Sequence, residues 1–328
     1  MLTSELLSRV EVIGIPTRTN FRGVQLREIA LIRGEKRWGE FSPFKDYSIE
    51  RDALWLQAAL EAVDEKFPAP MRTRVLVNAT LPEVPVAQVG EVLSWFPGSQ
   101  TVKVKVGTAN DEERIEEVFQ IIPDAQLRLD ANGMFSIAQA QDFFSTLYNK
   151  YRHRIEYVEQ PCATLEELRQ LKEKLAFEIK IAGDEVIRKA EDPFAINLQG
   201  AVDILMLKAA PLGGITRARE IGAHHKLPMV VSSALDSAVG ISYGLQLAAS
   251  LPSLDYACGL ATGQLLSADI AELPLKNGEL AVHSVSPDAD LLAKYAVPVE
   301  RLTWWKERTK RAFYAGAESE IKARGWNW

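Results

Sequence analysis

Acidic and basic residues recur along the middle of this chain, each at the end of an apolar run that is typical of a strand. Asp130, Glu159 and Asp184 form the acidic series, which Lys105 precedes and Lys208 follows. Successive members lie about 25 residues apart, which is the length that one strand, one helix and two loops require. A parallel βα array would therefore bring these five side chains to one rim of the sheet.

Three carboxylates and two lysines at such a rim indicate metal-dependent proton transfer. The carboxylates supply the oxygen ligands that Mg²⁺ or Mn²⁺ prefers. The lack of a nearby histidine or cysteine ligand argues against zinc. A divalent ion about 6 Å from a lysine ammonium repels it by on the order of 5 kcal/mol at a dielectric of about 20. This repulsion lowers the pKa of the lysine. Such a lysine can act as a general base, and the ion can stabilise the enediolate formed when a carbonyl-adjacent proton leaves.

Each of these residues also has a plainer interpretation. A single acid at the end of a strand is often a helix cap or a surface residue, and Lys208 is also suited to form a Schiff base. Lys103 and Lys105 lie two residues apart, so on a strand they share one face. That face is either the packed barrel interior, where a buried lysine needs charged partners, or the solvent side.

The composition favours a soluble, cytosolic protein. The chain has 328 residues, 47% of them hydrophobic, which is enough for a large core and two domains. Its net charge of −6 is spread along the chain, so nucleic acid and anionic membranes are not expected partners. We find no apolar run of the roughly 18 residues that a membrane span needs, and no signal peptide. Cys162 and Cys258 are interpreted as buried thiols of a cytoplasmic protein.

The hydrophobic pattern divides the chain into three parts. Residues 1–90 do not follow the βα rhythm and are predicted to form an α+β capping domain. Residues 91–270 follow it and are predicted to form a barrel of about eight strands, with the first strand starting at about residue 73. Residues 271–328 lose the rhythm and are predicted to pack back on the capping domain. This last segment contains Trp304, Trp305, Trp326 and Trp328.

Local patterns predict the elements of the first part in more detail. Residues 10–16 and 23–32 are predicted to be strands, joined by a polar loop at 17–22. A helix pattern runs from about residue 48 to 66 and stops before a proline. Residues 74–80 are predicted to be the first barrel strand.

Five short motifs occur in the order and spacing of one known family. They are Lys103-Val104-Lys105, Asp130-Ala131-Asn132-Gly133, Glu159-Gln160-Pro161, Asp184-Glu185 and Lys208. With them, nearly the whole chain resembles the enolase superfamily, in its muconate-lactonizing-enzyme-like branch. Within the branch, Gly39–Phe44 and Ser232–Gly240 look most like the o-succinylbenzoate synthase family of menaquinone biosynthesis. The resemblance implies a modified TIM barrel of the (β/α)7β type, with an N-terminal α+β capping domain that the C-terminal segment completes.

The same resemblance implies a lyase that dehydrates 2-succinyl-6-hydroxy-2,4-cyclohexadiene-1-carboxylate, a small dicarboxylate, through an enediolate. Asp130, Glu159 and Asp184 would bind Mg²⁺, with Mn²⁺ as a substitute, and the ion would hold the substrate carboxylate. Lys105 would remove the alpha proton and return it to the departing hydroxyl in a syn dehydration. Lys208 would stay protonated and stabilise the enediolate.

The resemblance also assigns supporting roles around this centre. Lys103 would tune the neighbouring lysine or pair with a ligand carboxylate, while Asn132 and Glu185 would orient the metal ligands. The loop at 17–22 would close over the substrate, where Arg22 or Arg18 would meet the succinyl carboxylate. The expected substrate-binding residues are Ser232, Ser233, Leu235 and Arg22, although the serines also suit a helix cap.

Other reactions fit the same residues. A racemase with one base on each face of the carbon, such as an N-succinylamino acid racemase, also needs both Lys105 and Lys208, and muconate cycloisomerisation is chemically compatible. A dipeptide epimerase usually carries Asp-x-Asp after the last strand, where this chain has Cys258-Gly259-Leu260. From different classes, a metal-independent aldolase that forms a Schiff base on Lys208 and a non-catalytic barrel that only binds its ligand stay open.

Overall fold

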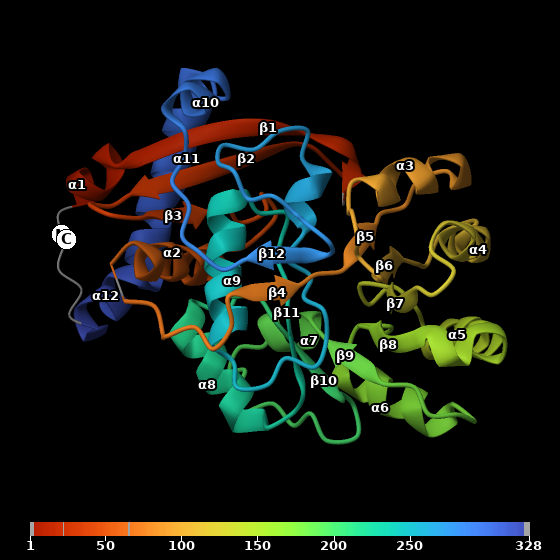
Figure 1. Cartoon of the computed structure of the whole chain (residues 1–328). Helices are drawn as coiled ribbons and strands as arrows, with labels where there is room; N and C mark the ends of the chain where they lie inside the picture. Colours follow the sequence, from red (N-terminus) through yellow and green to blue (C-terminus); the bar gives the residue numbers. More distant parts are fainter. Residues whose placement is uncertain (1–2, 22, 65, 325–328) are drawn as a thin grey trace.

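The computed structural model describes residues 3–21, 23–64 and 66–324. Figure 1 shows a small antiparallel sheet with its helices at one side of a curled parallel sheet, whose own helices lie on its outside. The predicted fold class, a modified TIM barrel with an N-terminal capping domain, is confirmed. Among the described residues, no helix is long and apolar enough to cross a membrane.

The barrel sheet has seven parallel strands in the spatial order β11-β10-β9-β8-β7-β6-β5. The strands are β5 (Ala79–Leu81), β6 (Thr101–Lys105), β7 (Gln126–Asp130), β8 (Ile155–Glu159), β9 (Ile181–Gly183), β10 (Ile204–Leu207) and β11 (Met229–Val231). The helices between and after them are η1 (Val86–Gln88), α3 (Val89–Ser94), α4 (Asp111–Ile121), α5 (Ile137–Tyr151), η2 (Arg152–Arg154), α6 (Leu165–Lys174), α7 (Glu185–Arg188), α8 (Ile215–His225), α9 (Ala238–Ser250) and η3 (Thr262–Leu265).

A short extended segment closes this sheet into a barrel. Cys258 forms a parallel bridge with Val77, and Gly259 forms one with Ser232 beyond the end of β11. The amide of Cys258 donates to the carbonyl of Leu76, and the amide of Gly259 donates to the carbonyl of Val231. The last strand expected from the sequence is therefore reduced to two bridges. These two bridges still join β11 to the first strands of the sheet.

Alternation along the strands sends apolar and charged side chains to opposite faces. On β6, Val102 and Val104 are fully buried in the main hydrophobic core, which lies between the sheet and its helices. Successive side chains of a strand point to opposite faces, so Lys103 and Lys105 point into the barrel rather than to solvent. Below the charged rim, the barrel interior is filled by a separate apolar cluster made up of Tyr157, Ala182, Ile204, Met206 and Val230.

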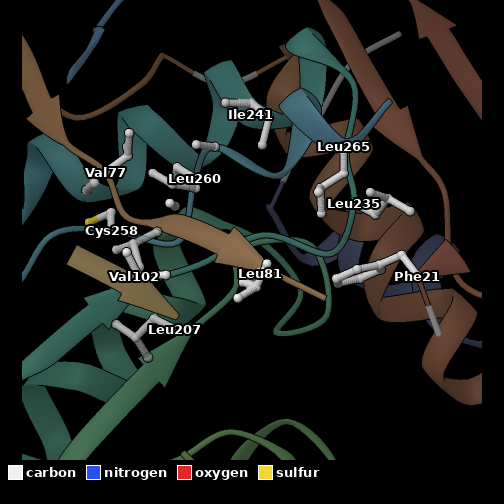
Figure 2. Packing of buried hydrophobic residues seen from close by; sticks show 14 of the residues in the cluster. Phe21, Val77, Leu81, Val102, Leu207, Leu235, Ile241, Cys258, Leu260 and Leu265 are labelled. Atoms are coloured by element: carbon white, nitrogen blue, oxygen red, sulfur yellow. The ribbon is translucent and has the colours of Figure 1, made fainter. Parts of the chain in front are cut away.

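The capping domain consists of an antiparallel sheet and a long helix. Its elements are α1 (Thr3–Ser8), β1 (Val10–Phe21), β2 (Val24–Arg33), β3 (Trp38–Phe41) and α2 (Ile49–Asp64). Figure 2 shows Phe21 in one packed group with Leu235 and Leu265 of the barrel, so the main hydrophobic core extends from the barrel into this domain, which also has a second apolar cluster.

The prediction of a loop at residues 17–22 is wrong for residues 17–21, because β1 continues to Phe21. The register of β1 against β2 shifts between Pro16 and Phe21, so this stretch is held by other partners. Thr17 forms a bridge with Leu266, and the carbonyl of Pro16 accepts from the amide of Ser267. Pairing with a distant segment thus extends a strand that its polar composition did not predict. Arg22 lies outside the described residues.

The prediction of one strand at residues 74–80 is also wrong. The structure has β4 (Arg74–Leu76), which pairs antiparallel with β12 (Glu279–Ala281), and only then β5 in the barrel. The chain changes partner near Val77 because the C-terminal segment supplies an antiparallel neighbour for its first half. No local pattern encodes such a distant partner.

The C-terminal segment returns to the capping domain through charged and aromatic contacts. Its helices are α10 (Ala289–Lys294), α11 (Val299–Ala312), η4 (Phe313–Ala317) and α12 (Glu318–Arg324). Trp305 is buried edge-on against Phe41 and donates to a carboxylate oxygen of Glu28 at 3.0 Å. Arg308 forms two hydrogen bonds with Asp52 of α2, at 2.6 and 2.7 Å, and both side chains are buried. Trp326 and Trp328 lie outside the described residues.

We predict that Asp52→Asn destabilises the protein by about 3 kcal/mol or more, because it leaves the buried Arg308 charge without its carboxylate. The control is Glu5→Gln, which removes a partly exposed pair with Arg9 and should cost less than about 0.5 kcal/mol. Urea unfolding followed by circular dichroism measures both. Equal losses of unfolding free energy in the two variants would show that the buried pair does not anchor the C-terminal segment to the capping domain.

Candidate active site

Hydrogen-bond register places the first three charged residues of the series side by side. Lys105 is the Cα partner of Asp130 across β6 and β7, and Asp130 is the Cα partner of Glu159 across β7 and β8. Glu159 in turn pairs with Ala182, two residues before Asp184. Paired residues on neighbouring parallel strands point to the same side, so this rim of the barrel carries one continuous row of charge.

Lys103 and Lys105 neutralise the first two carboxylates of this row. Lys105 Nζ lies 2.5 Å from Asp130 Oδ2 and donates to Asn132 Oδ1 at 2.7 Å. Lys103 Nζ lies 3.2 Å from both Asp130 Oδ2 and Glu159 Oε2, so its ammonium group stands between the two carboxylates. The sequence left open whether these lysines face solvent; Lys103 is buried and Lys105 is largely buried.

Asp184 is held from two sides. Its Oδ2 accepts from Lys208 Nζ at 2.6 Å, and its Oδ1 accepts from Arg188 Nε at 3.0 Å. All three side chains are buried. The neighbouring Glu185 accepts from Arg188 Nη2 at 2.6 Å and from Asn132 Nδ2 at 3.4 Å. The structure thus brings the predicted metal ligands, the two lysines predicted to be catalytic, Lys103, Asn132 and Glu185 together in one charged cluster.

Burial sets the proton affinities in this cluster. Burial raises the pKa of Glu159 to about 7, and the negative charge of Asp130 adds to this effect. Burial also favours a protonated Asp130 and Asp184, but lysines 105 and 103 beside the first, and Lys208 and Arg188 beside the second, lower the pKa of each carboxyl.

The two lysines of the Lys-x-Lys motif differ in proton affinity. Burial lowers the pKa of Lys105 and outweighs the opposing effect of Asp130, and the Lys103 ammonium acts in the same direction as burial. Burial also disfavours the charged form of Lys103, but Glu159 and Asp130 outweigh it, so the pKa of Lys103 is raised. Lys103 is therefore a fixed charge, whereas Lys105 is the lysine suited to release and take up a proton.

Two turns with left-handed backbone hold the rim. Asn132 has a φ of 48° and Gln160 a φ of 41°, values that a residue other than glycine rarely adopts. The amide of Asn132 donates to Asp130 Oδ1 at 3.1 Å. Gln160 Oε1 accepts from the amides of Asp184 and Val186, at 3.1 and 3.2 Å, and thereby ties the end of β8 to the end of β9.

The donor set fits a divalent cation by its chemistry. Three buried carboxylates stand at the ends of consecutive strands, and the raised pKa of Glu159 marks a carboxylate that positive charge would stabilise. Glu185 Oε2 is also buried, without a hydrogen-bond partner in the part of the chain that the structure describes. Across the described ranges, no three acidic, histidine or cysteine side chains are positioned as a metal-holding group. The ligand carboxylates face lysines instead, so their role in metal binding stays a prediction.

A cavity of about 810 Å³ opens beside Lys105. Its walls come from the tip of the capping-domain hairpin and from the loops that follow β5, β6 and β7, and they include Asn20, Phe21, Val84 and Met134. Lys105 Nζ lies 5.9 Å from the centre of the Phe21 ring. The cavity is large enough for a small dicarboxylate, and it meets the charged row at its lysine end.

Of the residues expected to contact the substrate, the described ones, Ser232, Ser233, Leu235 and Arg18, are not among those that line this cavity. Ser233 donates to the carbonyl of Gly259 at 2.6 Å and is hydrogen-bonded to Thr262, while Ser232 is 3.4 Å from the same carbonyl. Leu235 is fully buried in the core. Arg18 donates to the carbonyl of Leu266 at 3.0 Å and lies over a tryptophan ring. The structure does not bring these residues to the cavity beside Lys105, and their role in substrate binding stays a prediction.

The structure adds two residues that the sequence interpretation gave no role in the site. Arg188 follows Asp184 by four residues, a spacing that places both on one side of a helical turn, and this signal was available in the sequence. Gln160 was part of a quoted motif, but its hydrogen bonds to the next strand depend on the register of the barrel. Neither residue would be expected to contact a substrate directly.

Comparison with known proteins agrees with this fold. Residues 91–287 match the model of the family described as enolase C-terminal domain-like, and residues 12–63 match the one described as enolase N-terminal domain-like. An enolase, a putative sugar isomerase, from Streptomyces coelicolor superimposes with a TM-score of 0.71 at 22% identity, covering 89% of this chain and 96% of that one. The muconate lactonizing enzyme from Pseudomonas putida gives a TM-score of 0.69 at 18% identity, covering 88% and 98%.

Curated relatives are much closer in sequence. An o-succinylbenzoate synthase of Mycobacterium ulcerans is 45% identical over 316 residues, and one of Mycobacterium tuberculosis is 46% identical over 315 residues. Each match covers 94% of this chain and 94% of the relative. The fold and its charged rim define a protein with an enolase-type barrel and capping domain. The chain belongs to the enolase superfamily, in the family of these o-succinylbenzoate synthases.

The Gly39–Phe44 motif places a buried carboxyl group where the capping domain meets the barrel. Glu40 Oε2 accepts from the amides of Ser237 and Gly240, both at 3.1 Å, at the start of α9. Its Oε1 accepts from Ser42 Oγ at 2.6 Å. Burial raises the pKa of Glu40 to about 8, and the nearby charge of Asp236 contributes to the rise.

We predict that this carboxyl makes stability depend on pH. The folded protein keeps a proton on Glu40 that an unfolded chain, with a glutamate pKa near 4.3, releases. The contribution of Glu40 to the free energy of unfolding is fully present below about pH 4.3 and is lost as the pH rises through about 8. Glu40→Gln cannot release this proton, so its free energy of unfolding should fall less between pH 5.5 and pH 8.5, whatever its absolute value. Parallel curves for variant and wild type in urea titrations would contradict the assignment.

Proposed function

We propose that this chain is a Mg²⁺-dependent o-succinylbenzoate synthase, which removes water from 2-succinyl-6-hydroxy-2,4-cyclohexadiene-1-carboxylate in menaquinone biosynthesis. The observation that carries the proposal is the row of Lys105, Asp130 and Glu159 in direct register, continued by Asp184 and its partner Lys208. The mycobacterial relatives of that name support the choice of reaction.

Lys105 is the proton-transfer residue in this proposal. Because its pKa is lowered, the Lys105 ammonium loses its proton more readily than an ordinary lysine, and the free amine can accept the proton next to the substrate carboxylate. Asn132 Oδ1 and Asp130 Oδ2 fix the position of Nζ before the reaction, at 2.7 and 2.5 Å. The same ammonium then delivers its proton to the departing hydroxyl, so acid and base act from one face and the elimination is syn.

The other residues manage charge. A divalent ion, when bound by Asp130, Glu159 and Asp184, supplies positive charge next to the substrate carboxylate. Three strands separate Lys208, at the end of β10, from Lys105 on β6, so the Lys208 ammonium reaches the substrate from the other side and stabilises the negative charge that proton removal creates. Lys103 keeps its proton and balances the carboxylates below the substrate.

A second activity is favoured by the same placement of lysines. Lys105 and Lys208 approach the centre of the barrel mouth from different strands, which is the arrangement that a racemase needs for one base on each face of a carbon. Racemisation of N-succinylamino acids therefore remains the second candidate, with Lys208 acting as a base instead of as a fixed cation.

The proposal predicts that diene absorbance of the substrate disappears rapidly with wild-type protein and Mg²⁺. Lys105→Ala should lower the rate by at least about a hundredfold, because it removes the proton-transfer group. EDTA should abolish turnover, and added Mg²⁺ should restore it. Lys150→Ala, which removes an exposed lysine on α5, should leave the rate unchanged.

Absence of turnover in folded, Mg²⁺-supplied wild type would exclude the synthase. Deuterium exchange at the alpha carbon of N-succinylamino acids in D₂O would then test the racemase. Exchange that needs both lysines would support that second activity.

A further inference from the structure

One guanidinium group connects the predicted metal ligand Asp184 to the capping domain. Arg188 is buried, with a side chain 2% exposed. Its Nε donates to Asp184 Oδ1 at 3.0 Å, its Nη2 to Glu185 Oε1 at 2.6 Å, and its Nη1 to the hydroxyl of Tyr47 at 2.9 Å. Two nitrogens of this rigid, planar cation thus bind the barrel rim, and the third nitrogen binds the capping domain.

These contacts give the two carboxylate oxygens of Asp184 different partners. Oδ1 is committed to Arg188, whose planar guanidinium is also anchored elsewhere, while Oδ2 faces the ammonium of Lys208 on a flexible chain at 2.6 Å. An incoming cation therefore competes with Lys208 for Oδ2 and meets Oδ1 already occupied. The arrangement favours binding through a single oxygen of this carboxylate.

The capping-domain side of this link is well fixed. Tyr47 lies between β3 and α2, packed at an angle against the rings of Phe44 and Trp55, at centroid distances of 5.7 and 6.3 Å. Arg51, at the start of α2, donates to the backbone carbonyls of Arg188 and Lys189, at 3.4 and 3.1 Å. The end of α7 is therefore gripped by the capping domain through side chain and backbone together.

We propose that Arg188 is a positioning residue for Asp184, and that the Tyr47 hydroxyl couples docking of the capping domain to divalent-metal affinity. The inference rests on the metal-dependent function proposed above. Arg188 holds Oδ1 and leaves Oδ2 for the ion, and Tyr47 keeps the guanidinium in the plane that this requires. By reciprocity, the ion stabilises the docked cap by the same factor by which Tyr47 strengthens the ion's binding.

The test measures Mg²⁺ binding by isothermal titration calorimetry in protein without substrate. Tyr47→Phe removes only the hydroxyl and keeps the ring packing, so Mg²⁺ affinity should fall roughly fivefold, less than when the group that contacts the ligand is itself removed. Arg188→Met should weaken the affinity by about 10-fold to 100-fold. In turnover assays, Tyr47→Phe should need more Mg²⁺ for half-maximal activity, while its kcat at saturating Mg²⁺ matches that of wild type.

Tyr243→Phe is the matched control. The Tyr243 hydroxyl on α9 also crosses between the two domains, donating to Glu61 Oε1 of α2 at 2.6 Å, but this contact does not involve the three predicted ligands. This variant should lose thermal stability without a change in Mg²⁺ affinity. Equal affinities for wild type and Tyr47→Phe, or equal losses in both tyrosine variants, would overturn the inference and leave the proposed function intact. Wild-type protein that binds no Mg²⁺ would instead overturn both.

Discussion

Buried negative charge must be balanced by positive charge, and this constraint organises the site. Asp130, Glu159 and Asp184 are almost completely withdrawn from water, where an unpaired carboxylate is too costly to persist. Each is paired with a lysine from another strand. Because β6, β7 and β8 are in direct register, the charges stand close enough to compensate one another. The same closeness makes the proton affinities unequal, so that one lysine is suited to move a proton and its neighbour on the same strand is not.

The capping domain is part of this arrangement rather than an independent module. The hairpin tip with Phe21 forms a wall of the cavity beside Lys105, and Tyr47 reaches the rim through Arg188. The C-terminal helix α11 secures the same domain through the buried Arg308–Asp52 pair. The helices of the C-terminal segment thus hold the capping domain in place. The capping domain in turn determines how much of the barrel mouth is open to a substrate.

Periodic features were predictable from the sequence, and non-local pairings were not. The repeated interval between charged strand ends predicted the parallel array and its rim, because each βα unit has a nearly constant length. Capping chemistry is also encoded by neighbouring residues, as in the capping box that Thr164 and Glu167 form at α6. The far half of β1 was missed because its partners are Leu266 and Ser267. The separation of β4 from β5 was missed because β4 pairs with a strand from the C-terminal segment. The partners of the serines after β11 depended equally on tertiary contacts.

We propose that carboxylates at the ends of three consecutive strands form one divalent-cation site. The most direct test is a crystal structure of the protein soaked with Mn²⁺, using the anomalous scattering of the ion to locate it. We expect a single strong anomalous peak that touches one oxygen each of Asp130, Glu159 and Asp184, with the Lys103 and Lys208 ammonium groups displaced from those oxygens. A peak elsewhere, or none at a concentration that supports turnover, would contradict the account.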